Sequence, residues 1–105
     1  MEKRRDVFQA IADPTRREII NLLAHKSLNL NAIAENFQTS RPTISQHVKL
    51  LQECGLIVIT KQGRERYCRA HLAKLTEVAL WVNKYKAFWN AKLDALEDFL
   101  DRTEK

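Results

Sequence analysis

The sequence predicts a mainly α-helical domain with one β-hairpin, and three observations support this prediction. Apolar residues recur every three or four positions through most of the 105 residues, which is the spacing of one face of an α-helix. A short β-branched run at residues 56 to 61 ends at a glycine turn, as in a hairpin. The two prolines and two glycines stand where helices should begin or end, or where strands should turn.

The composition is that of one small folded domain with a basic surface. The 18 Lys and Arg residues outnumber the 13 Asp and Glu residues, which gives a net charge of +5 at pH 7, and 45% of the residues are hydrophobic. These values exclude a disordered or low-complexity chain. No apolar run is long enough to cross a membrane, and the charged residues 1 to 6 lead into no signal core. We therefore expect a cytoplasmic protein without a membrane partner.

The sequence carries no motif for catalysis, metal or cofactor binding. Cys54 and Cys68 are too few for a disulfide scaffold and form no short metal-binding pair. The three histidines, His25, His47 and His71, are too far apart in sequence for the usual spacing of metal ligands. A glycine-rich phosphate loop and a nucleophile elbow are also missing from the sequence. We therefore expect no enzyme, no metal site and no cofactor.

The basic charge lies in the middle of the chain. Across residues 40 to 70, six Lys and Arg residues stand against two Glu residues, which leaves a local charge of +4. The end of the chain, residues 93 to 105, is acidic instead. A polyanion would therefore be met by the middle of the chain.

Two helices are predicted in the first quarter of the chain. Apolar positions at helical spacing place the end of the first helix near residue 12 and that of the second near residue 25. Asp13 and Pro14 separate them, because Asp is a preferred helix cap and Pro is tolerated at the first helical position.

A short third helix and a tight turn are predicted next. Asn29 can cap this helix, whose apolar face is carried by residues 30 to 37. Gln38, Thr39 and Ser40 are polar and favour a turn. Residues 30 to 54 are therefore predicted to form helix, turn and helix.

The fourth helix is bounded at both ends. Ser40 or Arg41 caps its start, Pro42 fits its first turn because a missing N–H is harmless there, and Gly55 lies where a left-handed C-terminal cap is wanted. On a helical wheel one face is apolar and the opposite face is polar and cationic. The inner face carries Ile44, Val48, Leu51 and Cys54, and the outer side carries Arg41, Pro42, Ser45, Gln46 and Lys49.

The outer face of the fourth helix has side chains of the kind that contact DNA. Arg can form two hydrogen bonds with guanine, Gln can do so with adenine, and Ser or Thr can bond bases or phosphate. Residues 56 to 61 and 64 to 69 then form a hairpin with a basic tip. Helix, turn, polar-faced helix and basic hairpin, in this order, predict a winged helix-turn-helix that binds double-stranded DNA.

The remaining residues, about 72 to 102, contain neither Gly nor Pro and predict one long helix, or a short helix running into a longer one. About 30 helical residues span roughly 45 Å, whereas a compact domain of about 100 residues has a radius of gyration near 13 Å. Much of the apolar face of this region must therefore be covered by a partner.

Several motifs resemble the ArsR/SmtB family of bacterial transcriptional repressors. They are Asp13-Pro14-Thr15-Arg16, the run from Ser40 to Leu51, Cys54-Gly55-Leu56-Ile57, Gly63-Arg64 and Tyr67. The match covers nearly the whole chain. The resemblance implies a homodimeric repressor on a pseudo-palindromic DNA operator, with the fourth helix of each subunit in a major groove and the hairpin near the DNA backbone.

The resemblance also implies roles for individual residues. The positions that read bases in the groove are Arg41, Thr43, Ser45 and Gln46. Those that contact phosphates are Ser40 and Lys49 on the helix and Lys61, Gln62, Arg64 and Arg66 on the wing. The implied dimer surface joins the first and the terminal helices through Val7, Phe8, Ile11, Val78, Trp81, Val82, Tyr85, Phe88, Trp89, Leu93 and Leu96.

The metal sites of the family are missing from this sequence. The positions of its Cys-x-Cys pair are Asn29 and Asn31, and no His follows His71 to form the site on the terminal helix. The apolar pattern of the terminal helix resembles a metal-independent branch of the family; it consists of Trp81, Tyr85, Phe88, Trp89, Leu93, Leu96 and Leu100. Cys54 and Cys68 are interpreted as small buried residues or as a thiol sensor, although the redox members of the family pair cysteines on other helices.

Two alternatives stay open at the level of sequence. The aromatic face of the terminal region is either a dimer core or a pocket for an apolar effector, and no effector is identified. The fold is also compatible with a protein-interaction module such as an antirepressor or a co-regulator. The basic hairpin and the cationic fourth helix disfavour that module, since it has no reason to keep them.

Overall fold

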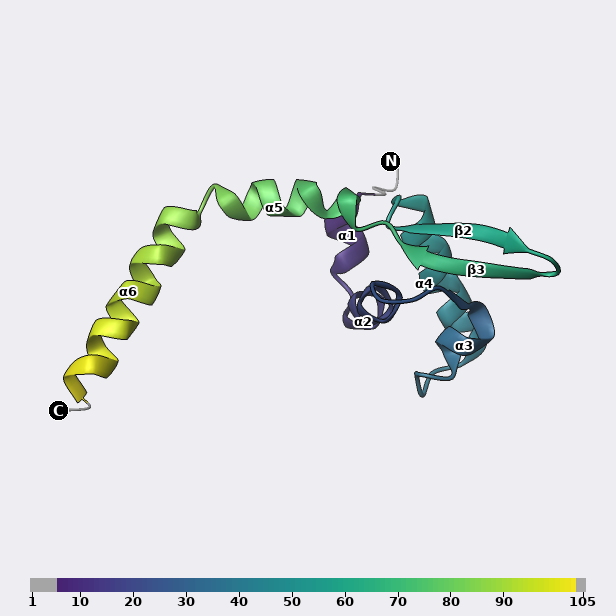
Figure 1. Cartoon of the computed structure of the whole chain (residues 1–105), viewed down its shortest axis with the longest axis horizontal. Coiled ribbons are helices and arrows are strands. Elements are labelled where there is room, and N and C mark those ends of the chain that lie inside the picture. Colours follow the sequence, from purple (N-terminus) through teal and green to yellow (C-terminus); the bar gives the residue numbers. More distant parts are fainter. Residues whose placement is uncertain (1–5, 104–105) are drawn as a thin grey trace.

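The computed structural model describes residues 6–103 and shows a helical body, a small sheet and an extended terminal arm (Figure 1). The charged start of the chain, residues 1–5, and residues 104–105 of the acidic tail lie outside the described residues. The elements are α1 (Val7–Ile11), α2 (Pro14–Leu23), β1 (Leu28–Asn29), α3 (Leu30–Ala34), α4 (Arg41–Glu53), β2 (Ile57–Gln62), β3 (Glu65–Ala70), the 3₁₀ helix η1 (Leu72–Leu75), α5 (Thr76–Asn83) and α6 (Lys86–Thr103).

Side-chain caps fix the starts of the first two helices. The backbone N–H of Gln9 donates to Asp6 at 2.9 Å, and that of Arg16 donates to Asp13 at 3.0 Å. Pro14 occupies the first helical position of α2, as the sequence predicts. These caps satisfy N–H groups that have no partner within the helix.

The end of α4 is closed by a left-handed glycine. Gly55 has φ of +81°, a conformation that costs a residue with a Cβ about 1–2 kcal/mol. The N–H of Gly55 donates to Gln52 O at 3.0 Å, and that of Leu56 donates to Leu51 O at 2.9 Å. This pair of bonds is a Schellman motif, so the predicted C-terminal cap is confirmed.

The hairpin belongs to a three-stranded antiparallel sheet with the order β1-β3-β2. Strands β2 and β3 pair from Ile57 opposite Ala70 to Gln62 opposite Glu65, and Gly63 in the turn has φ of +65°. Strand β1 was not predicted from the sequence, because two residues are too few to show an alternating pattern.

The hydrophobic core lies entirely in the body. The inner face of α4 packs into it, as the helical wheel predicts. The buried residues are Val7, Ala10, Ile19, Ile20, Leu23, Ile33, Ile44, Val48, Leu51, Cys54, Leu56, Ile57 and Cys68. The terminal arm consists of η1, α5 and α6, residues 72–103. Its residues Leu75 and Val78 are partly buried against the core cluster, so the arm touches the core at its start.

The terminal region is divided into pieces. Of the two arrangements that the sequence allows for residues 72 to 102, the structure has the short helix followed by a longer one: η1 runs into α5, and α5 and α6 are separated at residues 84–85. The N–H groups of Lys84 and Tyr85 bond carbonyls three residues back, at 3.3 and 2.9 Å, which tightens the last turn of α5. The arm then leaves the body (Figure 1), and the radius of gyration is 18.4 Å. Within residues 6–103 no helix is long and apolar enough to cross a membrane.

Candidate nucleic-acid interface

Helix α4 presents its polar side to the surface. Arg41, Gln46 and Lys49 are exposed, and Thr43 and Ser45 are half-buried. The buried inner face of α4 fixes the rotation of the helix about its axis. Three of the residues that the resemblance implies as base readers, Arg41, Ser45 and Gln46, therefore lie on the outer side, and Thr43 lies in the first turn of the helix.

The start of α4 carries two exposed hydroxyl groups. Ser40 is the N-cap and accepts a hydrogen bond from the backbone N–H of Thr43 at 3.3 Å. The hydroxyl groups of Ser40 and Thr43 are also 2.9 Å apart. A helix N-terminus carries partial positive charge and suits phosphate, so this end of α4 is compatible with a DNA backbone.

Arg41 is held by the preceding helix. Its Nε donates a hydrogen bond to Asn31 Oδ1 across ten positions of the chain. This bond fixes the side chain between α3 and the wing. Sequence reasoning had considered Asn31 only as a missing metal ligand, and nothing in the local pattern signals its pairing with Arg41.

The wing places its cations next to Arg41. Residues 61–66 are all exposed, and Lys61 pairs with Arg66 across the hairpin. A shallow cavity of about 230 Å³ joins the wing to the helix-turn-helix, and it is lined by Asn29, Leu30, Asn31, Arg41, Arg64, Glu65 and Arg66. Three guanidinium groups against one carboxylate leave this cavity positively charged, which favours an anionic partner.

A second side-chain bond ties the wing to α3. Asn29 Nδ2 donates to Glu65 Oε2 at 2.6 Å, while Asn29 Oδ1 accepts from the N–H of Ala32 at 2.8 Å and so caps α3. The wing, α3 and α4 are thus connected by the side-chain hydrogen bonds of Asn29 and Asn31. Glu65 is the one acidic residue that lines the cavity, and its carboxylate already accepts the hydrogen bond from Asn29.

Arg16 links the first helix to α4. Its guanidinium donates to Ala10 O at 2.7 Å and to Gln9 O at 3.1 Å, which are carbonyls at the end of α1. Its third contact is with Nδ1 of His47 on α4, at 3.3 Å.

The carboxylate of Asp13 is stabilised at the same junction. Partial burial raises the pKa of Asp13, but hydrogen bonds from the N–H groups of Arg16 and Thr15 and the nearby charges of His47 and Arg16 lower it more. The pKa of Asp13 therefore lies below its ordinary value. The Asp13-Pro14-Thr15-Arg16 motif thus caps the start of α2, donates hydrogen bonds to carbonyls at the end of α1 and contacts His47 of α4.

The arm carries an uncovered apolar surface. Phe8 of α1 contacts Trp81 at 5.9 Å between ring centroids, and Trp81 contacts Tyr85 at 5.5 Å. The other large exposed apolar residues of the arm are Leu72, Leu80, Val82, Phe88, Trp89, Leu93, Leu96, Phe99 and Leu100. An apolar hollow of about 570 Å³ lies at the bend between α5 and α6.

Three residues of the implied dimer surface also pack within the chain. Val7 is 0% exposed, so we assign it to the core and not to a dimer surface. Ile11 and Val78 are partly buried against the core and keep only part of their surface for a partner. The remaining residues of the implied surface are exposed.

The cysteines lie inside the body. Cys54 and Cys68 are both buried and form no disulfide, and burial raises the pKa of the Cys68 thiol. A raised pKa leaves less of the reactive thiolate, which favours a packing role. Among residues 6–103 no group of three His, Cys, Asp or Glu side chains could hold a metal ion.

The sequence is similar to bacterial regulators. The family profile described as bacterial regulatory protein, arsR family, matches residues 13–58. The transcriptional repressor SdpR of Bacillus subtilis is 35% identical over 77 residues, which cover 73% of this chain and 86% of that protein. The HTH-type transcriptional regulator Rv2034 of Mycobacterium tuberculosis is 31% identical over 94 residues, which cover 90% of this chain and 85% of that protein.

The fold is similar to that of solved regulators. An ArsR-like transcriptional regulator from Rhodococcus sp. RHA1 superposes with a TM-score of 0.72 and 34% identity, over 90% of this chain and 87% of that one. The similarity extends through the helix-turn-helix, the wing and part of the arm, since it covers nine-tenths of the chain. Both the sequence and the structure comparisons thus point to the same class of protein.

Proposed function

Because the chain belongs to the arsR family of bacterial regulatory proteins, and is therefore a DNA-binding regulator of transcription, we propose that it is a homodimeric repressor of a pseudo-palindromic operator. The whole chain acts as one winged helix-turn-helix domain in the cytoplasm, without catalysis. Helix α4 enters the major groove, and the wing follows the DNA backbone.

One observation carries this proposal: the polar side of α4 and the basic wing meet at a single positively charged surface. In the proposed complex Arg41, Thr43, Ser45 and Gln46 contact base edges. Ser40, Lys49, Lys61, Gln62, Arg64 and Arg66 contact phosphates. The cavity shared by Arg41, Arg64 and Arg66 supports this division, because it brings a base-reading position beside two backbone-binding positions.

The exposed apolar surface of the arm is the observation that supports a homodimer. A second copy is the partner whose surface matches by symmetry, because a two-fold interface uses the same patch on both subunits. Covering the exposed apolar face of α5 and α6 removes it from water, which favours association. Two-fold symmetry then predicts two half-sites about 10 to 10.5 base pairs apart, or a multiple of that spacing.

Fluorescence anisotropy on labelled duplexes tiled across the region upstream of the gene tests this function. With random competitor DNA present, we expect tight binding to one tile and a steep loss of affinity as salt rises, because cations released from phosphates drive binding. Weak and equal binding to every tile in the presence of competitor would contradict sequence-specific recognition at that region and would favour the protein-interaction module.

Gln46 gives the sharpest test of base reading. Gln46→Ala should cost about 1–3 kcal/mol on the selected tile and relax the preference at one base pair. Gln52→Ala is the matched control, because Gln52 is exposed at the opposite end of the same helix and is expected to change affinity less than about twofold. Equal losses on the operator and on random DNA for Gln46→Ala would remove Gln46 from the base-reading set.

A further inference from the structure

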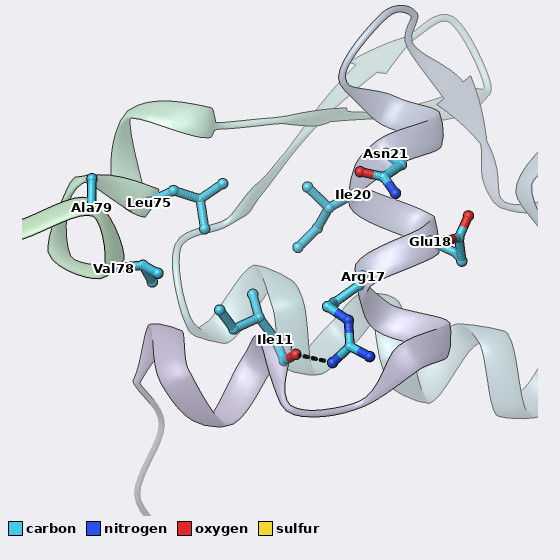
Figure 2. A pocket seen from close by; sticks show the side chains of 8 residues that line it. All are labelled: Ile11, Arg17, Glu18, Ile20, Asn21, Leu75, Val78 and Ala79. Atoms are coloured by element: carbon cyan, nitrogen blue, oxygen red, sulfur yellow. Dashed lines mark hydrogen bonds between the residues drawn. The ribbon is translucent and has the colours of Figure 1, made fainter. Parts of the chain in front are cut away.

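A cavity of about 450 Å³ lies between α2 and the start of the arm, away from the proposed DNA surface (Figure 2). It is built from three parts of the chain: the end of α1, the exposed side of α2, and the segment from η1 into α5. The lining residues are Ile11, Arg17, Glu18, Ile20, Asn21, Leu75, Val78 and Ala79.

The wall of the cavity is apolar. Figure 2 shows Ile20 on α2 facing Leu75 and Val78 across the space, with Ile11 below them. Ile20 is buried in the core and the other three are partly buried against it. The cavity therefore opens the edge of the hydrophobic core to solvent. Its volume falls in the range of small-molecule sites, about 300–1,000 Å³.

The polar residues that line the cavity all come from α2, and they are Arg17, Glu18 and Asn21. Figure 2 shows the Glu18 side chain on the side of α2 away from Leu75 and Val78, whereas the Arg17 guanidinium lies next to Ile11. Arg17 and Asn21 are four residues apart and so lie on the same face of the helix. Nη1 of Arg17 donates to Ile11 O at 2.8 Å, which holds the side chain at the lower end of the cavity. The Arg17 side chain makes no other hydrogen bond within residues 6–103, so its remaining guanidinium N–H groups can bind a ligand.

We propose that this cavity is a binding site for a small amphipathic organic anion. The apolar part of the ligand packs on Ile11, Ile20 and Val78, and its carboxylate accepts hydrogen bonds from Arg17. A neutral apolar molecule would leave Arg17 without a new partner, and an organic cation would be repelled by it. An inorganic anion would leave the apolar wall in contact with water.

The position of the cavity gives a bound ligand a structural consequence. Leu75 and Val78 join the arm to the core, and both line the cavity. A ligand there would alter the angle between α5 and α2. If the proposed dimer forms through the arm, that angle sets the distance between the two α4 helices, so this consequence rests on the proposed function while the binding itself does not.

Nuclear magnetic resonance of isoleucine methyl groups tests the site directly. The full chain has seven isoleucines, and none lies in residues 72–105, so the exposed apolar face of the arm carries no such signal. Octanoate is the probe, and 1-octanol and octyltrimethylammonium are its neutral and cationic controls. We expect saturable shifts of the Ile11 and Ile20 methyl signals with octanoate, while Ile33, Ile44, Ile57 and Ile59 stay unchanged.

Two variants separate the apolar wall from the cation. Arg17→Gln should weaken octanoate binding about tenfold and leave octanol binding unchanged. Lys26→Gln is the matched control, because Lys26 is exposed just beyond α2 and lines no part of the cavity. Ala79→Trp fills the cavity from an exposed position on α5 and should abolish the shifts. Should Ala79→Trp fail to fold, the comparison of Arg17→Gln with Lys26→Gln still decides whether the guanidinium of Arg17 binds octanoate.

Three results would overturn the proposal. The first is no shift of Ile11 and Ile20 at saturating octanoate. The second is equal affinity for octanoate and octyltrimethylammonium, since the site would then have no preference for an anion. The third is a shift that appears only when Leu93→Asp makes the protein monomeric, because the second copy would then be the occupant of the cavity. None of these results depends on DNA binding, so the proposed function is tested separately.

Discussion

The body and the arm differ in what covers their apolar residues. In the body, residues from α1 to β3 bury one another, and helix ends are closed by Asp13, Ser40 and Gly55. In α5 and α6 no residue is buried. Both regions have apolar residues at helical spacing. This spacing therefore predicts a helix, but it does not reveal whether the apolar face of that helix is buried by the same chain or by a partner.

This difference assigns the two regions different tasks. The body holds α4 and the wing in a fixed relation through its core and through the bonds Asn29–Glu65 and Asn31–Arg41. The arm is the part whose geometry depends on a second molecule. The following predictions test this division, from the largest expected effect to the smallest.

The largest effect is expected for a leucine of the body. Leu51→Ala should lower the free energy of unfolding by about 2–5 kcal/mol, because Leu51 is fully buried and its loss leaves a cavity. Leu96→Ala is the matched change in the arm, where Leu96 is 53% exposed. It should weaken self-association instead. Urea denaturation and sedimentation at several protein concentrations measure both, and equal losses of unfolding free energy at all concentrations would refute the division.

A smaller effect is expected at the end of α4. Gly55→Ala should lower the unfolding free energy by about 1–2 kcal/mol, because φ of +81° disfavours a side chain. The space itself is not the obstacle, since an added Cβ would lie 3.4 Å from the flexible Lys74 side chain. Gly55→Asn is the control and should cost less, because Asn tolerates this conformation. A Gly55→Ala midpoint in urea equal to the wild type would show that the turn relaxes.

The cap of α2 is expected to contribute about 1 kcal/mol at neutral pH, which Asp13→Ala should remove. Since the pKa of Asp13 is lowered in the folded chain, its charge stabilises the fold above the unfolded pKa of about 3.9. This contribution is lost as the pH falls through the lower, folded value. The difference between wild type and Asp13→Ala should therefore shrink in acid.

Asp94→Ala is the control for this prediction, because Asp94 is exposed on the arm and caps no helix. It should change thermal unfolding little at either pH. A gap between wild type and Asp13→Ala that widens as the pH falls would contradict the pKa shift at Asp13.

The smallest effect is expected from oxidation. Because Cys54 and Cys68 are buried and the pKa of Cys68 is raised, mild oxidation should change DNA affinity less than about twofold, as thiolate character and exposure control the reaction. Anisotropy before and after oxidation measures this. A reversible loss of binding that disappears in the Cys54→Ser, Cys68→Ser double variant would establish the thiol sensor instead.

Sequence reasoning predicted the elements whose signals are local. Asp13, Pro14 and Ser40 mark helix starts because capping acts over three residues, and Gly55 marks an end because the left-handed cap requires it. The inner and outer faces of α4 follow from the spacing of its apolar residues, which matches the repeat of an α-helix. The observed fold confirms the predicted fold class, and three of the candidate base readers, Arg41, Ser45 and Gln46, lie on the outer side of α4.

The unpredicted features depend on contacts distant in sequence. Strand β1 exists through its pairing with β3, and Arg16 meets His47 across 31 positions. Asn31 orients Arg41 from a neighbouring helix. A short helix followed by a longer one was among the predictions for the terminal region, but the position of the break at residues 84–85 was not predicted, because no Gly or Pro signals it. Such features are set by tertiary packing, which a single sequence does not display.

The most direct test of the central claim is the mass of the complex formed by the full chain on the tightest-binding upstream duplex. The account predicts two chains per duplex, bound in one cooperative step. It also predicts a loss of affinity of about a thousandfold or more between about 50 and 200 mM salt, as expected for six or more phosphate contacts. One chain per duplex, bound with the same affinity at both salt concentrations, would contradict it.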